Sequence, residues 1–229
     1  MASLKQELGE NLYSCCVYGS AVRGNAIEGV SDLNLLLILN HSDAAAHEAV
    51  ARAIGGRAEI EPFVLGRRGF ERSERAFATK FASIQRNYRV LAGADPLATF
   101  TVDAGLEKFL CEQALRNLRL RLAHMFITRQ QSKAYDKFLV RNVTTVFVQF
   151  AEAARLNGVT VPSTFEARIP ILESAFKIQG QVLRDLLVLK KSPHKLSDAE
   201  CIAWHERVFP MVDAVLGAIE AQWPATSLK

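Results

Sequence analysis

The most restrictive feature of the sequence is a nearly continuous apolar run from Asp32 to Leu39, with polar residues on both sides. The run is far too short for a membrane-spanning helix, which needs ~20 apolar residues. Its length and composition predict a strand that is buried on both faces. Because helices must cover such a strand, the run favours an α/β or α+β domain.

The rest of the first hundred residues alternates between helical and strand patterns. Gly55 and Gly56 form a stop signal for one helix. Pro62 cannot donate a ladder hydrogen bond, so it indicates an edge or an end of a strand. Gly93 closes the last helical pattern. We therefore predict helices over residues 4–12, 41–54 and 71–91, and strands over residues 14–18, 32–39 and 57–65.

The second half of the sequence has no convincing strand pattern after about Val102. Ser197, followed three residues later by Glu200, resembles a helix capping box. The segment 92–101 contains glycine and proline and is the best domain boundary. We expect an α+β protein in which a mixed sheet with helices, residues 1–98, precedes an all-α helical bundle, residues 99–229. Helices are predicted over residues 106–126, 132–156, 165–189 and 197–223.

The composition narrows the class of protein. The formal charge of +4, from 28 basic and 24 acidic residues, suits an anionic ligand but gives no reason to expect a nucleic-acid partner. The first ten residues have no signal-peptide core, so we expect a cytoplasmic protein without a membrane partner. The cysteines follow no metal-ligand or disulfide pattern, so we expect reduced thiols at Cys15, Cys16, Cys111 and Cys201.

The residues with the clearest chemical potential are Gly19-Ser20 and the start of the apolar run. Glycine lets the backbone approach a ligand closely, and free N–H groups at a helix start suit a phosphate. Arg23 adds a cation near the same phosphates. Asp32 and Asn34 have side chains on one face of a strand, because strand side chains alternate. Their oxygen atoms are of the kind that holds Mg²⁺ together with substrate phosphates.

This pattern resembles the signature of the nucleotidyltransferase superfamily, which includes DNA polymerase beta-like and aminoglycoside nucleotidyltransferase-like proteins. The resemblance implies that Gly19 and Ser20 bind a nucleoside triphosphate and that Asp32 binds Mg²⁺. In that family a third carboxylate on a later strand completes the metal site or acts as a base. Glu59 and Glu61 are the candidates, and we favour Glu61 because it lies in the more apolar part of its strand.

The segment from Phe77 to Pro96 is similar to bacterial proteins in which such a domain precedes a helical domain. The helical half resembles the helical domains of aminoglycoside nucleotidyltransferases and of the HEPN class. The resemblance also implies a homodimer.

Position 34 departs from the family pattern, which has aspartate where this chain has Asn34. Asparagine keeps an oxygen ligand but loses the charge that stabilises a metal site. One implied function is Mg²⁺-dependent transfer of a nucleoside monophosphate from a nucleoside triphosphate to a hydroxyl of a small molecule or protein. Asp32 and Glu61 would then be catalytic, with Asp32, Asn34 and Glu61 at the metal. The alternative is a catalytically degenerate nucleotide-binding or regulatory protein.

The helical half offers weaker candidates. Arg119 and His124 fit the spacing of the ribonuclease motif of HEPN proteins, although an arginine-rich helix produces such a pair by accident. Glu112, Arg116 and Arg119 lie on one helix face, where they would either contact phosphates or form surface ion pairs, and we favour the ion pairs.

Overall fold

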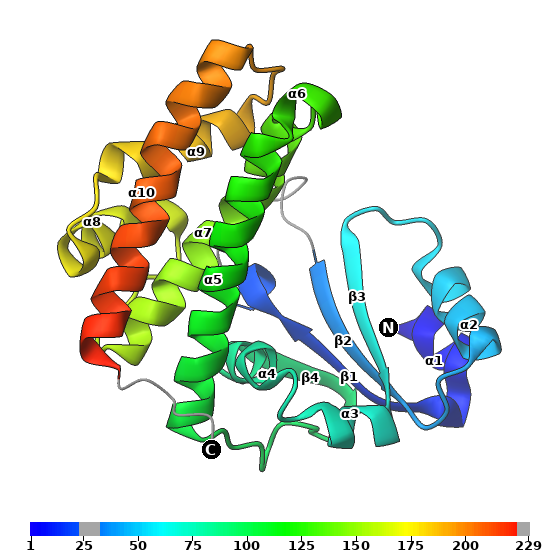
Figure 1. Cartoon of the computed structure of the whole chain (residues 1–229). Helices are drawn as coiled ribbons and strands as arrows, with labels where there is room; N and C mark the ends of the chain where they lie inside the picture. Colours follow the sequence, from blue (N-terminus) through cyan, green and yellow to red (C-terminus); the bar gives the residue numbers. More distant parts are fainter. Residues whose placement is uncertain (23–32, 224–229) are drawn as a thin grey trace. The chain divides into compact units, whose positions relative to one another are not determined.

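The chain is represented by a computed structural model that describes residues 1–22 and 33–223. The chain divides into two compact units, Met1–Leu106 and Glu107–Lys229. The first unit contains the sheet, and the second is helical wherever it has regular structure within the described residues (Figure 1). Arg23 and Asp32 lie outside the described residues.

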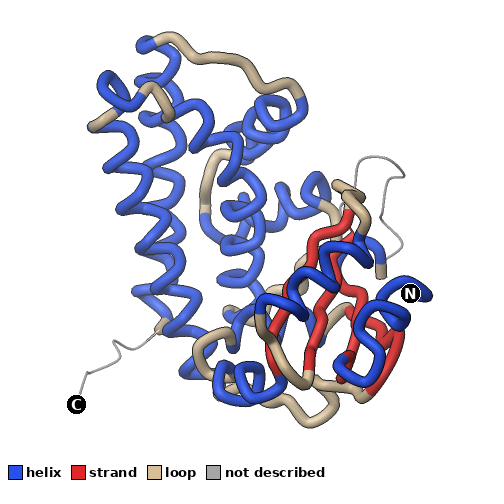
Figure 2. The backbone as a smooth tube through the Cα atoms, turned by 90° about the vertical axis from the view of Figure 1, so that its right-hand side faces the viewer, coloured by secondary structure: helices blue, strands red, loops and turns tan. Residues whose placement is uncertain are grey.

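The first unit is built on a mixed four-stranded sheet with the order β3-β2-β1-β4. β2 pairs with β1 in antiparallel and with β3 in parallel orientation, and β1 pairs with β4 in antiparallel orientation. The strands of the sheet are the red segments of Figure 2. β3 is therefore an edge strand, which is one of the two positions that Pro62 indicates. The strands are β1 (Leu12–Tyr18), β2 (Leu33–Leu39), β3 (Ile60–Gly66) and β4 (Tyr88–Gly93).

Alternation along β1 and β2 sends side chains into two different layers. One layer packs Val17, Leu35 and Leu37 against residues of α1 and α2. Leu36 and Ile38 point to the other face and are completely buried there, so the prediction of a strand buried on both faces is confirmed. The helices of this unit are α1 (Ala2–Leu8), α2 (Ala44–Ile54), α3 (Arg67–Ser73) and α4 (Ala78–Gln85), and the single turns η1 (Gly9–Asn11) and η2 (Gly19–Ala21) flank β1.

Phenylalanine rings attach α3 and α4 to the second face of the sheet. Phe81 of α4 is fully buried. Its ring centroid lies 4.9 Å from Phe70, 5.8 Å from Phe100, 6.1 Å from Phe77 and 6.2 Å from Phe63. Phe63 belongs to β3 and is the register partner of Leu36. Phe81 is thus the centre of the core on this face and fixes the position of α4.

The predicted helix over residues 71–91 is wrong. The segment forms the end of α3, all of α4 and then strand β4. The apolar residues of the segment have a helical spacing, but Tyr88, Val90 and neighbouring residues pair with β1 instead. Gly93 ends the strand at φ 76°, and a Cβ there would clash with the carbonyl oxygen of Tyr13. A tertiary contact with β1 therefore overrides the local pattern.

The second unit is a set of packed helices, and no strand occurs among its described residues. The capping box of Ser197 and Glu200 is present and confirms that prediction. The single helix predicted over residues 165–189 is wrong, because Lys177 adopts a left-handed conformation, φ 53°, that ends α8. The helices are α5 (Ala104–Ile127), α6 (Arg129–Ser132), α7 (Tyr135–Leu156), α8 (Phe165–Phe176), α9 (Gly180–Lys191) and α10 (Asp198–Gln222). Within the described ranges, none of the helices is long and apolar enough to cross a membrane.

Tyr88 at the start of β4 gives the fold a pH dependence. Its hydroxyl donates to Asp95 at 2.8 Å, and burial together with this carboxylate raises the pKa of Tyr88 to about 12. The folded state therefore holds the proton more tightly than the unfolded state. The resulting stability is present below about pH 10 and is lost as the pH rises towards 12.

We expect the Tyr88→Phe variant not to lose this stability as the pH rises. The measurement is the free energy of unfolding in denaturant at several pH values between about 9 and 12, with the wild type and the variant compared at each pH. The free energy of unfolding should fall more steeply with pH for the wild type. Parallel curves would contradict a native hydrogen bond from Tyr88 to Asp95.

Candidate functional site

Three of the predicted site residues meet at one end of the sheet. β1 is antiparallel to β2, so the end of β1 at Tyr18 lies beside the start of β2 at Asn34. β3 is parallel to β2 and starts at the same end, with Glu61 opposite Asn34. Gly19 follows β1 directly. We call Gly19, Asn34 and Glu61 the sheet-end site.

Gly19 has a backbone conformation that favours glycine, and it lies beside Asn34. Its φ is 82°, in the left-handed region, and a Cβ would lie 3.6 Å from the Nδ2 atom of Asn34. Its N–H donates to the carbonyl oxygen of Asn87 at 3.1 Å. Ser20 follows in η2. The backbone at Gly19 is therefore in van der Waals reach of the Asn34 side chain, and its N–H is bonded within the protein.

Asn34 and Glu61 are direct neighbours on β2 and β3, so their side chains lie on the same face of the sheet. Asn34 is half-buried and Glu61 is exposed. Glu59 lies in the turn before β3 instead of in the strand, where its carbonyl oxygen accepts a hydrogen bond from Leu33 N–H at 2.6 Å. The structure thus brings Glu61, rather than the Glu59 side chain, into register with Asn34.

Lys80 and Tyr18 join this face, although the sequence did not single them out. The Lys80 ammonium lies 5.0 Å from the centre of the Tyr18 ring and 5.7 Å from that of Phe63. Tyr18 is the register partner of Asn34 on β1. The row Tyr18, Asn34, Glu61 therefore crosses three strands, with Lys80 of α4 above its first member.

The pKa values of this group reflect its surroundings. Part of the Lys80 side chain remains exposed, but the protein around it removes water from the ammonium group and lowers the pKa. Burial raises the pKa of Tyr18, and the negative charge of Glu61 raises it further. A partly dehydrated cation and a carboxylate on one surface form an environment for a charged, polar ligand.

Oxygen donors at the sheet-end site match the preference of Mg²⁺ for carboxylates and amides. Among residues 1–22 and 33–223, no three His, Cys, Asp or Glu side chains come together as a metal site. Glu61 contributes one carboxylate and Asn34 one amide oxygen. A magnesium site here would need a further carboxylate, and the predicted one, Asp32, lies outside the described residues.

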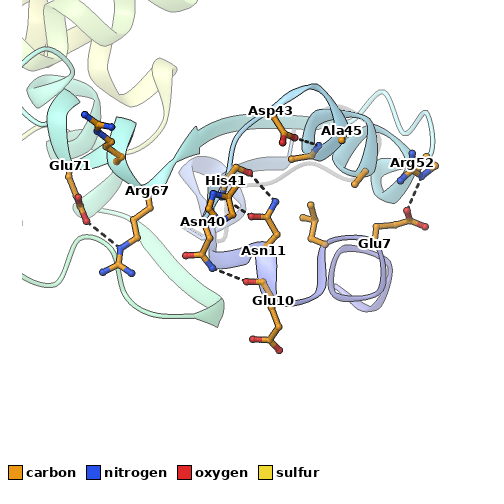
Figure 3. Close-up of a pocket in the computed structure, with 14 residues that line it drawn as sticks. Glu7, Glu10, Asn11, Asn40, His41, Asp43, Ala45, Arg52, Arg67 and Glu71 are labelled. Atoms are coloured by element: carbon orange, nitrogen blue, oxygen red, sulfur yellow. Dashed lines mark hydrogen bonds and ion pairs between the residues drawn. The ribbon is translucent and has the colours of Figure 1, made fainter.

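A separate cavity of about 1040 Å³ lies at the opposite end of the sheet (Figure 3). Asn11 and His41 form two hydrogen bonds at its wall. Asn11 Nδ2 donates to the carbonyl oxygen of His41 at 2.9 Å, and the His41 N–H donates to Asn11 Oδ1 at 2.7 Å. Arg52 pairs with Glu7 and Arg67 pairs with Glu71. In each of these two pairs the charges neutralise each other, so neither pair provides net positive charge for binding a phosphate.

The arginines of α5 take part in ion pairs. Arg116 contacts Glu112 at 2.6 Å and Glu220 of α10 at 2.7 Å. Arg119 pairs with Asp213 of α10. This confirms the interpretation of Glu112, Arg116 and Arg119 as surface ion pairs. Since Asp213 already holds Arg119, the spacing of Arg119 and the exposed His124 gains no support as a ribonuclease motif.

Comparison with known proteins does not assign the chain to a family. The sequence matches no protein-family model, and a search of curated proteins gives no significant match.

Proposed function

We propose that the first unit is a nucleotidyltransferase-type domain that binds a nucleoside triphosphate and Mg²⁺ at the sheet-end site. The proposed reaction transfers a nucleoside monophosphate to a hydroxyl of a small molecule or protein, at a rate lowered by Asn34. The observation that carries the proposal is the meeting of Gly19, Asn34 and Glu61 at one end of the sheet.

The triphosphate needs a close backbone approach and positive charge. Gly19 provides the first, because its side-chain-free backbone stands beside Asn34. Lys80 provides the second from α4. Ser20 and Arg23 are the further phosphate contacts that the sequence motif suggests, with Arg23 outside the described residues.

The chemistry is an in-line displacement. The acceptor oxygen forms a bond to the α-phosphorus, the bond from that phosphorus to the bridging oxygen breaks, and pyrophosphate leaves. Glu61 takes the hydroxyl proton in this scheme, since it is exposed on the same face as Asn34. Asp32, Asn34 and Glu61 would hold Mg²⁺, which supplies charge stabilisation for the phosphates when bound.

Asn34 favours a second candidate function. A neutral ligand stabilises a dication and a developing negative charge much less than a carboxylate does. A protein with this site would bind a nucleotide and regulate its interactions with other molecules, without transferring a nucleoside monophosphate. The two candidates share the binding site and differ in turnover, so an assay with α-labelled triphosphates and Mg²⁺ separates them.

Lys80 provides a direct test of the triphosphate site. We expect the Lys80→Met variant to bind nucleoside triphosphate about tenfold more weakly, because one charge-assisted contact is lost. The Lys80→Arg variant keeps the charge and should retain most of the affinity. Titration calorimetry with each triphosphate and Mg²⁺ measures both. Equal affinity of Lys80→Met and the wild type would remove Lys80 from the site.

A further inference from the structure

The helical unit carries a surface with unmatched positive charge. Two adjoining cavities of about 470 and 530 Å³ share Lys133, Asp136 and Lys195 in their walls. One wall follows the end of α6 and the start of α7, and the other is the connection between α9 and α10. We call this surface the basic groove; its cationic lining residues are Arg129, Lys133, Lys137, Arg141 and Lys195.

The cations of the basic groove differ from those elsewhere in the helical unit. Arg116 and Arg119 of α5 contact carboxylates of α10. In contrast, the ion pairs among the described residues use none of Lys133, Lys137, Arg141 or Lys195. Like charges that lie close together without matching carboxylates repel one another. Binding of an anionic partner would reduce this repulsion.

The acidic residues of the basic groove do not cancel this charge. Asp198 accepts from Arg129 at 2.7 Å, which uses both members of that pair. Asp136 is the other carboxylate that lines the cavities. The remaining cations therefore exceed the remaining carboxylates.

The spacing of the cations suits a repeating anion. Lys137 and Arg141 are four residues apart on α7, about one turn of ~5.4 Å along the helix. Lys133 precedes α7 and lines both cavities, and Lys195 faces them from the opposite wall. Cations on two walls, distributed over two adjoining cavities, suit several phosphates of one chain better than a single phosphate group.

The floor of the basic groove carries little that would read a base. Tyr135 lies there, but it is almost fully buried and its hydroxyl is bonded to Nδ1 of His205 at 3.0 Å. Cys201 is also buried. Contacts with a ligand would therefore come from the charged rim, which recognises a backbone and not a sequence.

A membrane surface fits less well. Helices that bind at a lipid interface present large apolar side chains beside their cations. The exposed large apolar residues of the helical unit do not line the cavities; they are Phe109, Leu120, Ile127, Val148 and Val188.

We propose that the basic groove binds the phosphodiester backbone of a single nucleic-acid strand. The proposal is independent of nucleotide binding at the sheet-end site. The overall charge of +4 does not predict this nucleic-acid binding, because a net charge does not show which cations are paired with carboxylates and which are not.

The test uses the full chain and labelled single-stranded RNA and DNA oligonucleotides of mixed sequence, with binding followed by fluorescence anisotropy. The groove variant combines Lys133→Asn, Lys137→Gln and Arg141→Gln. The control variant combines Lys177→Asn, Lys108→Gln and Arg184→Gln, which line neither cavity and change the net charge equally. Lys133 and Lys177 are matched, since both have left-handed φ values, 48° and 53°.

We expect binding at about 50 mM salt to weaken about tenfold or more in the groove variant, with the slope of log affinity against log salt reduced by roughly 2. The control variant should keep the wild-type affinity and slope, and thermal unfolding checks that both variants fold. Three results would overturn the proposal. They are no binding by the wild type, an equal loss in the control variant, or stronger binding to phosphatidylserine vesicles or polyglutamate than to either oligonucleotide.

Discussion

The Asn34→Asp variant should transfer label from an α-labelled nucleoside triphosphate about a hundredfold faster than the wild type. The substitution adds a carboxylate on β2 next to Glu61, on the same face of the sheet. A second negative charge would hold Mg²⁺ more tightly and stabilise charge that develops during displacement. The change is nearly isosteric, so the backbone of Gly19, which stands beside the Asn34 side chain, need not move.

The assay follows label in trichloroacetic-acid precipitates and in small-molecule fractions, with all four nucleoside triphosphates and Mg²⁺. The Asn34→Ala variant controls for the amide, because it removes the oxygen ligand and should lower any transfer that the wild type shows. Activity in Asn34→Asp alone would favour the degenerate binding protein as the natural function. Asn34→Asp activity no higher than that of Asn34→Ala would contradict a metal ligand at this position.

Phe81→Ala should lower the free energy of unfolding of the first unit by roughly 3–5 kcal/mol. The ring is fully buried and contacts the rings of Phe63, Phe70 and Phe100. Its removal leaves a cavity that surrounding aromatic side chains cannot fill without leaving their rotamers. Because Lys80 precedes Phe81 on α4, the variant should also bind triphosphate more weakly.

Phe77→Ala is the matched control for this prediction. Phe77 also contacts Phe81, with centroids 6.1 Å apart, but it is 43% exposed. Its removal should cost much less, on the order of 1 kcal/mol. Chemical denaturation monitored by circular dichroism measures both, and Phe81→Leu gives an intermediate value if Phe81→Ala does not fold. Equal losses for Phe77→Ala and Phe81→Ala would show that Phe81 is not the centre of this core.

The strand β2 could be predicted because its pattern is self-contained. A buried central strand is apolar on both faces, and the run up to Leu39 has that composition. Pro62 limited its position to an edge or an end of a strand, because its own nitrogen carries no hydrogen. The capping box at Ser197 depends only on residues within one helical turn. These features are local, so sequence alone contains their physical cause.

The features that were missed depend on distant contacts. β4 forms because Tyr88 and Val90 find partners on β1, about seventy residues earlier in the chain. The end of α8 depends on a left-handed lysine, Lys177, which carries no sequence signal of the kind that glycine gives. The sequence did not indicate Lys80 as a site residue, because it lies in the segment that was predicted as one long helix. Only the packing of α4 places its ammonium group over the Tyr18 ring.

For the sheet-end site, the sequence identified Gly19, Asn34 and Glu61, which the structure brings together. It could not choose firmly between Glu59 and Glu61, because these residues are two apart and would share a strand face, so only the register of β3 against β2 decides which one lies opposite Asn34. Asp32 and Arg23 remain predictions from the sequence, as does the role of Ser20.

The most direct test of the central claim is calorimetric titration of the wild-type protein and the Gly19→Val and Asp32→Ala variants with ATP, GTP, CTP and UTP, each with Mg²⁺. The wild type should bind at least one triphosphate saturably. Gly19→Val should abolish this binding, because a side chain at φ 82° is strained and extends towards Asn34, and Asp32→Ala should weaken its dependence on Mg²⁺. Absence of triphosphate binding by the folded wild type, or unchanged binding by both folded variants, would contradict a nucleotide site at this end of the sheet.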